Sequence, residues 1–250
     1  MKNNYETLTE EEVRAYLLRL NLDPSMDLTP SKELLDILLK AHHLTVPFED
    51  IWVYEGKLPL SIEVKDLFDK IVNKRRGGYC FELNGLFVTL LRTLGFNAYS
   101  CFCRVMIMGD AIRPIAHRGN IIEVDGKKYF GAVGFGGAMP DGGLLLEDGS
   151  LQQIDKELYK AIYEEGGWWT IMRKKQGKDD DYVEDADESF THVIMFNEAM
   201  ADPVDFYALN ASVSMNEMAP FRRVFMCNLR TEEGYRSIND LVLKEKKNVS

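Results

Sequence analysis

The sequence predicts an α+β protein, because the spacing of its apolar residues changes twice along the chain. Up to about residue 95 they recur at the three- and four-residue intervals of helices, and from Ala98 they alternate as in strands. A polar, mostly acidic stretch at 178–188 marks a boundary, after which strands and a short helix are mixed. With 250 residues, 46% of them hydrophobic, the chain is long enough for one or two cores.

The first segment has the pattern of a helical bundle. Thr9 and Glu12 have the spacing of a capping box at the start of one helix. Thr29-Pro30 predicts that the next helix begins with proline at its first position, and Pro47 ends the pattern of that helix. Four helices are expected, with starts at Thr9, Thr29, Ser61 and Cys80.

The middle segment has the pattern of antiparallel strands. Strands are expected at Ala98–Ile107, Gly119–Val124 and Lys127–Val133. Asp125-Gly126, between the last two, is typical of a two-residue type I′ hairpin turn. A small barrel or sandwich therefore follows the helices. The last segment predicts a strand at Phe190–Phe196, a short helix from Asp202 and two strands around Glu232–Gly234.

The composition argues against several classes of partner. A formal net charge of −10 disfavours nucleic acid and anionic membrane surfaces, and no segment resembles a signal peptide or a membrane span. The four cysteines are too few and too irregular for a disulfide framework. Cys101 and Cys103 should point to one face of a strand, but no further Cys or His pair completes a metal-ligand set. The sequence thus predicts a cytoplasmic protein without a metal, and it leaves the oligomeric state open.

One short segment, Arg-Arg-Gly-Gly-Tyr-Cys-Phe-Glu-Leu-Asn at 75–84, places Cys80 in the first turn of a helix. Gly77 and Gly78 are expected to end the preceding helix in the left-handed conformation. Unpaired amide N–H groups and the helix macrodipole favour an anion at a helix start. A thiol there ionises more readily and becomes a nucleophile. The alternative is a buried, inert cysteine.

A thiolate enzyme needs a base, and histidine is the usual one. His42 and His43 lie at the end of a helix, where packing or capping is the simpler role, and His192 lies within a strand. His117 differs from these because it stands at the mouth of a strand that leads into a glycine-rich segment. His117 is therefore the candidate partner of Cys80.

The register of the predicted hairpin shows what lies beside His117. If Asp125-Gly126 forms the turn, counting back places His117 opposite Gly134 and position 119 opposite Ala132. Side chains 117 and 132 are then diagonal neighbours, roughly 7–8 Å apart on one face. An aspartate at 132 would reach a ring nitrogen of His117, but the chain has alanine there. Asp141 is the one nearby acid that could fold back.

These motifs together resemble the arylamine N-acetyltransferase family. Arg76 to Asn84 matches its nucleophile motif, Val46 to Asp50 its Ile-Pro-Phe-Glu-Asn segment, and Val133 to Gly137 its glycine-rich loop. The resemblance implies a cysteine-proteinase-like Cys–His core in three parts. These are a helical bundle at 1–95 with Cys80, a β-barrel at 96–188 with His117 and the loop, and an α/β lid at 189–250.

The resemblance also implies a reaction and its participants. Acetyl-CoA is the expected donor and co-substrate, an aromatic amine or hydroxylamine the acceptor, and an acetyl-cysteine the intermediate of a ping-pong reaction. Gly134, Gly136 and Gly137 are expected to let the backbone approach CoA closely. Phe135 and Phe48 are expected to contact the acceptor; for Phe135 the alternative is a place in the barrel core.

The chain departs from the family pattern at one position of the site. The family has Asp-Val-Gly-Phe-Gly where this chain has Ala132-Val133-Gly134-Phe135-Gly136. Three hypotheses follow. The first is an active transferase that relies on Cys80 and His117 with or without an unusual third member. The second is a weakened or inactive homologue that binds CoA or an aromatic ligand. The third is another Cys–His acyl chemistry, such as that of a peptidase or transglutaminase.

Overall fold

The computed structural model describes residues 5–107, 111–137, 139–174 and 189–247. The acidic stretch at 178–188, which the sequence marks as a boundary, lies outside the described residues. No helix in the described ranges is long and apolar enough to cross a membrane.

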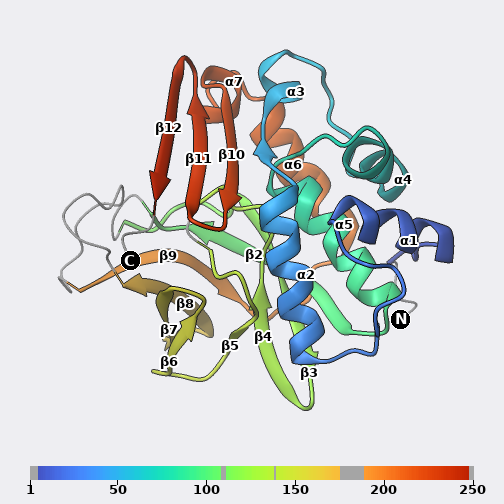
Figure 1. The fold of residues 1–250 in the computed structure, drawn as a ribbon. Helices are drawn as coiled ribbons and strands as arrows, with labels where there is room; N and C mark the ends of the chain where they lie inside the picture. Colours follow the sequence, from blue (N-terminus) through green and yellow to red (C-terminus); the bar gives the residue numbers. More distant parts are fainter. Residues whose placement is uncertain (1–4, 108–110, 138, 175–188, 248–250) are drawn as a thin grey trace.

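The N-terminal part consists of helices, which lie together on one side of the molecule (Figure 1). They are α1 (Glu10–Arg19), α2 (Lys32–Thr45), α3 (Ile51–Tyr54), α4 (Val64–Phe68), the π-helical segment η1 (Asp69–Asn73) and α5 (Cys80–Thr93). The predicted capping box is confirmed, since Thr9 and Glu12 bond each other's backbone amides. The predicted first position of α2 is wrong, because the hydroxyl of Ser31 accepts the Leu34 amide and so caps a helix that begins after Pro30.

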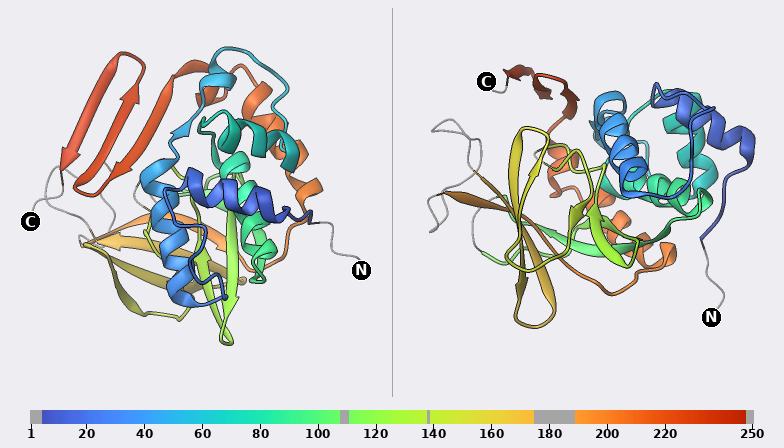
Figure 2. Two further views of the ribbon diagram at one scale, coloured as in Figure 1. Left: turned by 45° about the vertical axis from the view of Figure 1, so that its right-hand side comes forward. Right: turned by 60° about the horizontal axis from the view of Figure 1, so that its bottom comes forward.

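An eight-stranded antiparallel sheet forms the second part. In spatial order its strands are β5 (Leu144–Leu145), β4 (Lys127–Gly131), β3 (His117–Val124), β2 (Asn97–Val105), β9 (Phe190–Asn197), β8 (Trp168–Lys174), β7 (Glu157–Glu164) and β6 (Leu151–Ile154). The sheet curls into a nearly closed barrel, seen at the lower left of Figure 1 and in the right-hand view of Figure 2. Between the edge strands, the side-chain amide of Gln152 bonds both backbone groups of Leu145, which bridges the gap.

A smaller antiparallel sheet packs beside the helices. Its order is β1 (Phe48–Glu49), β10 (Met226–Thr231), β11 (Gly234–Asn239) and β12 (Val242–Lys247). Before β10 come the 3₁₀ turn η2 (Pro203–Asp205) and the helices α6 (Phe206–Met215) and α7 (Pro220–Arg223). Two strands around the turn at 232–234 were expected, and β12 is an addition. The division at 95/96 and 188/189 stays a prediction; β9, which follows the second boundary, pairs with β2 and β8 in the barrel.

The predicted hairpin register is confirmed as far as the strands run. Val124 pairs with Lys127 around the turn, and the pairing continues to Asn120 and Gly131. β4 ends there, so the residues after Gly131 leave the sheet as a loop. On its other side β3 pairs with β2, where Cys103 lies opposite His117. The end of β3 that carries His117 is therefore held by its pairing with β2. The glycine-rich segment does not pair there and turns toward the helices.

Helix α5 is the central element of the core, because it is buried along almost its whole length between the other helices and the barrel. The side chains that join it to α2 and β3 are Leu83, Leu86, Phe87, Leu90, Leu35, Leu38 and Ile122. Figure 1 shows α5 directly behind α2 and beside β3. The helix that begins with Cys80 is thus fixed by packing on several sides.

The glycines before Cys80 have a different role from the predicted one. The left-handed residue after η1 is Arg75, with φ 53°, and not Gly77 or Gly78. Gly77 is needed for space instead, because a Cβ there would lie 2.1 Å from the carbonyl oxygen of Pro47. Gly78 donates to that same oxygen at 3.3 Å, and Glu49 donates to the Gly78 carbonyl at 2.9 Å. The Pro-Phe-Glu segment and the cysteine motif therefore interlock through their backbones.

This close approach predicts a stability defect. Gly77→Ala should lower the free energy of unfolding by about 3 kcal/mol or more, because backbone cannot move aside as a side chain can. Gly126→Ala is the control, since its added Cβ meets open space and only the φ of +72° is unfavourable; its cost should be about 1–2 kcal/mol. Urea unfolding of both variants measures the difference, and equal losses would contradict the steric argument.

Candidate active site

Cys80 is the first residue of α5, as the sequence predicts. The turn is built by Glu82, whose carboxylate accepts the Tyr79 amide at 3.1 Å and the Lys70 ammonium at 2.7 Å. Both charged side chains are almost fully buried. Removal of either Glu82 or Lys70 would leave the other as an unpaired buried charge, so this ion pair fixes the geometry of the turn.

The thiol of Cys80 faces the backbone on both sides of His117. Its Sγ lies 4.0 Å from the carbonyl oxygen of Ala116, and the backbone amide of Arg118 donates to it. The predicted pair of Cys80 and His117 is thus brought to one place, where the start of α5 meets the start of β3. Cys80 is 2% exposed and His117 is 3% exposed.

Burial decides the protonation of this pair. It raises the pKa of Cys80 to about 12, although the amides of Arg118 and Phe81 oppose the shift. It lowers the pKa of His117 to about 3. Desolvation disfavours the charged form of each group. The expectation of a readily ionised thiol is therefore wrong for this closed arrangement, in which thiol and imidazole are both neutral at pH 7.

Asn84 connects the three parts of the site. Its side-chain Nδ2 donates to the Arg118 carbonyl at 2.6 Å, and its Oδ1 accepts the Val133 amide at 2.8 Å. Asn84 is fully buried and lies one turn after Cys80 on the same helix. Asn84 therefore braces the site, because one amide ties the cysteine helix to the histidine strand and to the start of the glycine-rich loop.

The Nε2 atom of His117 is buried and has no hydrogen-bond partner within the part of the chain that the structure describes. Ala132 is buried in the barrel core and offers only a methyl group. Asp141 does not fold back onto His117; it pairs with His43 at 2.8 Å and with Arg230 at 2.7 Å. No acid therefore orients His117 among the described residues.

The other histidines mostly follow expectation. His42 packs in the helical core against Phe87, with its Nε2 3.1 Å from the Tyr16 hydroxyl. His43 instead reaches out of α2 to Asp141 and to the Ala132 carbonyl. The sequence could not signal this contact, because its partners lie about ninety residues away and no local pattern links them.

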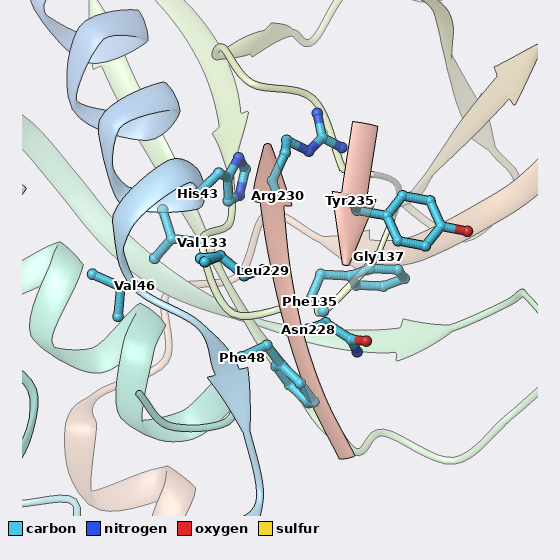
Figure 3. Close-up of a pocket in the computed structure, with 11 residues that line it drawn as sticks. His43, Val46, Phe48, Val133, Phe135, Gly137, Asn228, Leu229, Arg230 and Tyr235 are labelled. Atoms are coloured by element: carbon cyan, nitrogen blue, oxygen red, sulfur yellow. The ribbon is translucent and has the colours of Figure 1, made fainter. Parts of the chain in front are cut away.

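The glycine-rich loop lines a cavity of about 40 Å³ together with residues of β10 (Figure 3). Of the predicted ligand-binding residues, Phe48, Phe135, Gly136 and Gly137 line it. Gly134 lies instead on Cys80, where a Cβ would come within 2.9 Å of the Cys80 Cα. A pocket for a small organic ligand usually measures about 300–1,000 Å³. At about 40 Å³ this cavity is smaller than such pockets, and neither Cys80 nor His117 is among the residues that line it.

The remaining cysteines form no centre of their own. The Sγ atoms of Cys101 and Cys103 are 3.8 Å apart inside the barrel, on one strand face as predicted, and both thiols are free. Within the described ranges no three His, Cys, Asp or Glu side chains are grouped so as to hold a metal ion.

Fold and site together define a class, namely α+β proteins in which a cysteine at a helix start meets a histidine on a strand of an adjoining barrel. Comparison with known proteins narrows this class. The family model described as N-acetyltransferase matches residues 32–249. The chain belongs to the arylamine N-acetyltransferase family.

Individual relatives agree with this assignment. An arylamine N-acetyltransferase / N-hydroxyarylamine O-acetyltransferase of Salmonella typhimurium is 36% identical over 163 residues, which are 64% of this chain and 56% of that protein. A solved structure of the enzyme from the same organism has a TM-score of 0.83 at 25% identity and covers 98% of this chain and 87% of that one. The Mycobacterium marinum enzyme in complex with CoA has a TM-score of 0.79 at 24% identity, covers 91% and 80%, and supports the fold alone. The chain spans about half the length of the first curated relatives it matches, 56% and 45%.

The depressed pKa of His117 predicts a pH effect on stability. Below pH 6.5 the unfolded chain binds a proton at this position that the folded chain takes up only near pH 3. The folded state therefore loses stability as the pH falls through that window, by up to about 1.4 kcal/mol per pH unit. His117→Gln should remove this share of the acid slope, measured by urea unfolding between about pH 6 and pH 4. Parallel pH curves for the two proteins would show that His117 is not held neutral.

Proposed function

We propose that the chain is an acetyltransferase that moves an acetyl group from acetyl-CoA to an arylamine or N-hydroxyarylamine through an acetyl-cysteine. The observation that carries the proposal is Cys80 at the start of α5, with its thiol against the backbone on both sides of His117. The family match spans this region. A cytoplasmic location stays a prediction.

The first half-reaction forms the acetyl-enzyme. His117 takes the thiol proton as the Cys80 sulfur attacks the acetyl carbonyl, and the tetrahedral intermediate collapses by breaking the bond to the CoA sulfur. The imidazolium then returns the proton to the leaving CoA thiolate. Because the resting pair is neutral, the proton moves only when the ligand fills the site. The Cys80 amide at the helix start is the proposed donor to the oxyanion.

The second half-reaction releases the product. The acceptor nitrogen or oxygen attacks the acetyl-cysteine, and His117 removes its proton. The bond to Cys80 breaks, and the thiolate recovers its proton from His117. Phe48 and Phe135 are the proposed walls for the aromatic ring, and Gly136 and Gly137 the proposed backbone contacts to CoA; all four line the cavity. In this scheme Gly134 lets the loop pack closely on Cys80, because a Cβ at this position would collide with the cysteine backbone.

A catalytically weakened homologue is the second candidate, and the orphaned Nε2 of His117 favours it. Loss of the aspartate from a serine-protease triad lowers kcat by about 10⁴. Such a protein would still bind CoA or an aromatic ligand, but would form the acetyl-enzyme slowly.

The test of the proposal is intact-mass analysis after incubation with acetyl-CoA. One acetyl adduct should form on the wild-type protein and disappear when an arylamine is added. Cys80→Ser should abolish the adduct, whereas Cys227→Ser, at a half-buried free cysteine, should leave it unchanged. A protein that binds CoA without forming an adduct would be the weakened homologue, and an adduct that persists in Cys80→Ser would refute the assigned nucleophile.

The vacancy at position 132 gives a second prediction. Ala132→Asp should raise the turnover of an aromatic amine, because a carboxylate there can accept from His117 Nε2 and stabilise the imidazolium. Ala132→Asn, of equal size but uncharged, should gain less. Steady-state rates of the two folded variants decide the matter. A rate that stays flat or falls in Ala132→Asp would mean that His117 is already oriented by other contacts.

A further inference from the structure

A group of polar side chains joins the helices, the barrel and the small sheet beyond the end of the glycine-rich loop. It consists of His43 on α2, Asp141 after the loop and Arg230 on β10. Their side chains are 10%, 6% and 18% exposed. In Figure 3, His43 and Arg230 lie side by side above Phe135 and Gly137. The acyl-transfer chemistry proposed above uses none of these three residues.

His43 binds residues on both sides of the loop with one ring. Its Nε2 is 3.0 Å from the carbonyl oxygen of Ala132, just before the loop, and its Nδ1 is 2.8 Å from Asp141 Oδ1, after the loop. Burial raises the pKa of Asp141, but the hydrogen bond from His43 and the charge of Arg230 lower it below its ordinary value. Both partners of His43 are therefore hydrogen-bond acceptors, the Asp141 carboxylate and the Ala132 carbonyl.

Arg230 holds the same end of the loop from the other side. Its Nη1 is 2.7 Å from Asp141 Oδ2, and its Nη2 donates to the Met139 carbonyl at 2.9 Å. The guanidinium also lies 3.8 Å from Glu157 on β7. Charge-assisted contacts of this kind are shorter and stronger than neutral ones. The loop is thus clasped from two elements that are distant in the sequence, α2 and β10.

The clasped loop is what packs on His117. The ring of Phe135 meets the ring of His117 edge to face, with centroids 5.5 Å apart. The same loop rests on Cys80 through Gly134 and is held by Asn84 through the Val133 amide. Since His117 Nε2 has no described acceptor, its orientation depends on this packing. A shift of the loop would move Phe135 and so release the imidazole.

We propose that His43, with Asp141 and Arg230, is a positioning residue that orients His117 through the glycine-rich loop, in the absence of an acid at position 132. This proposal rests on the proposed function for its consequence in catalysis. His43 itself does not touch the reacting atoms; it acts through the Ala132 carbonyl and Phe135.

The first experiment measures the single-turnover rate of Cys80 acetylation at saturating acetyl-CoA. His43→Gln should slow it by about 10- to 100-fold, the cost of a misplaced catalytic group. Asp141→Asn, which keeps the shape of the side chain, should act in the same direction. Lys40→Gln is the matched control: Lys40 lies on the same helix, its side chain is 40% exposed, and it pairs with Asp155 and Glu232 at 3.7 and 3.6 Å. Its rate should equal that of the wild type, and urea unfolding confirms that each variant is folded.

The second experiment separates positioning from a purely structural role. His43→Gln is made again in the Ala132→Asp background, where a carboxylate can hold His117 directly. The loss caused by His43→Gln should then shrink by at least about fivefold, as expected for coupled sites. An equal loss in both backgrounds, or no loss in either, would overturn the proposal.

A parallel readout keeps the proposal testable if the acetylation itself fails. The rate of Cys80 alkylation by iodoacetamide requires no acetyl-CoA, and it too depends on proton transfer to His117. The same pattern of loss and recovery should appear there. If alkylation shows this pattern of loss and recovery but no acetyl adduct forms, the proposed function is refuted and the positioning role of His43 is retained. If the adduct forms but the rates are unaltered in both His43→Gln and Asp141→Asn, the positioning role alone is refuted.

Discussion

The site depends on one buried amide, that of Asn84. Its two hydrogen bonds hold the Arg118 carbonyl next to His117 and the Val133 amide at the start of the loop, while its helix begins with Cys80. A buried backbone group without a partner costs about 1–3 kcal/mol. Helix, strand and loop are therefore held together by polar contacts that cannot be replaced by packing alone. The closeness of Gly134 to Cys80 follows from this arrangement.

The same closeness sets the electrostatics of the pair. Placing Gly134 and Phe135 over Cys80 and His117 excludes water, and burial then holds both groups neutral. The helix start stabilises a thiolate, but in this structure desolvation is the larger effect. A dry site strengthens the interactions that a bound thioester makes with the amide at the helix start. In the proposed mechanism, the thiol therefore loses its proton only as it attacks the bound thioester.

The sequence could predict the parts of the site that depend on local rules. Helix capping and periodicity predicted Cys80 at a helix start, and the type I′ turn predicted the β3–β4 register as far as Asn120 and Gly131. The sequence could not predict that Cys80 and His117 are buried, because their desolvation is set by the loop and by side chains from three parts of the chain. The sequence also failed to predict Arg75 as the left-handed residue. Glycine is required at position 77 because a side chain there would collide with Pro47, and not because Gly77 has a left-handed backbone angle. Likewise, the place of β9 in the barrel follows from long-range pairing with β2 and β8.

The absence of an acid at position 132 changes what the fold has to supply. A carboxylate would orient His117 by a hydrogen bond and stabilise its charged form, whereas packing by Phe135 can supply orientation only. Asp141, which follows the loop, is hydrogen-bonded by His43 and paired with Arg230. Charge in this region therefore holds the loop and does not act on the imidazole. In the proposed mechanism, the imidazolium formed as the Cys80 sulfur attacks therefore has no carboxylate partner, and its charge is balanced by the oxyanion of the tetrahedral intermediate.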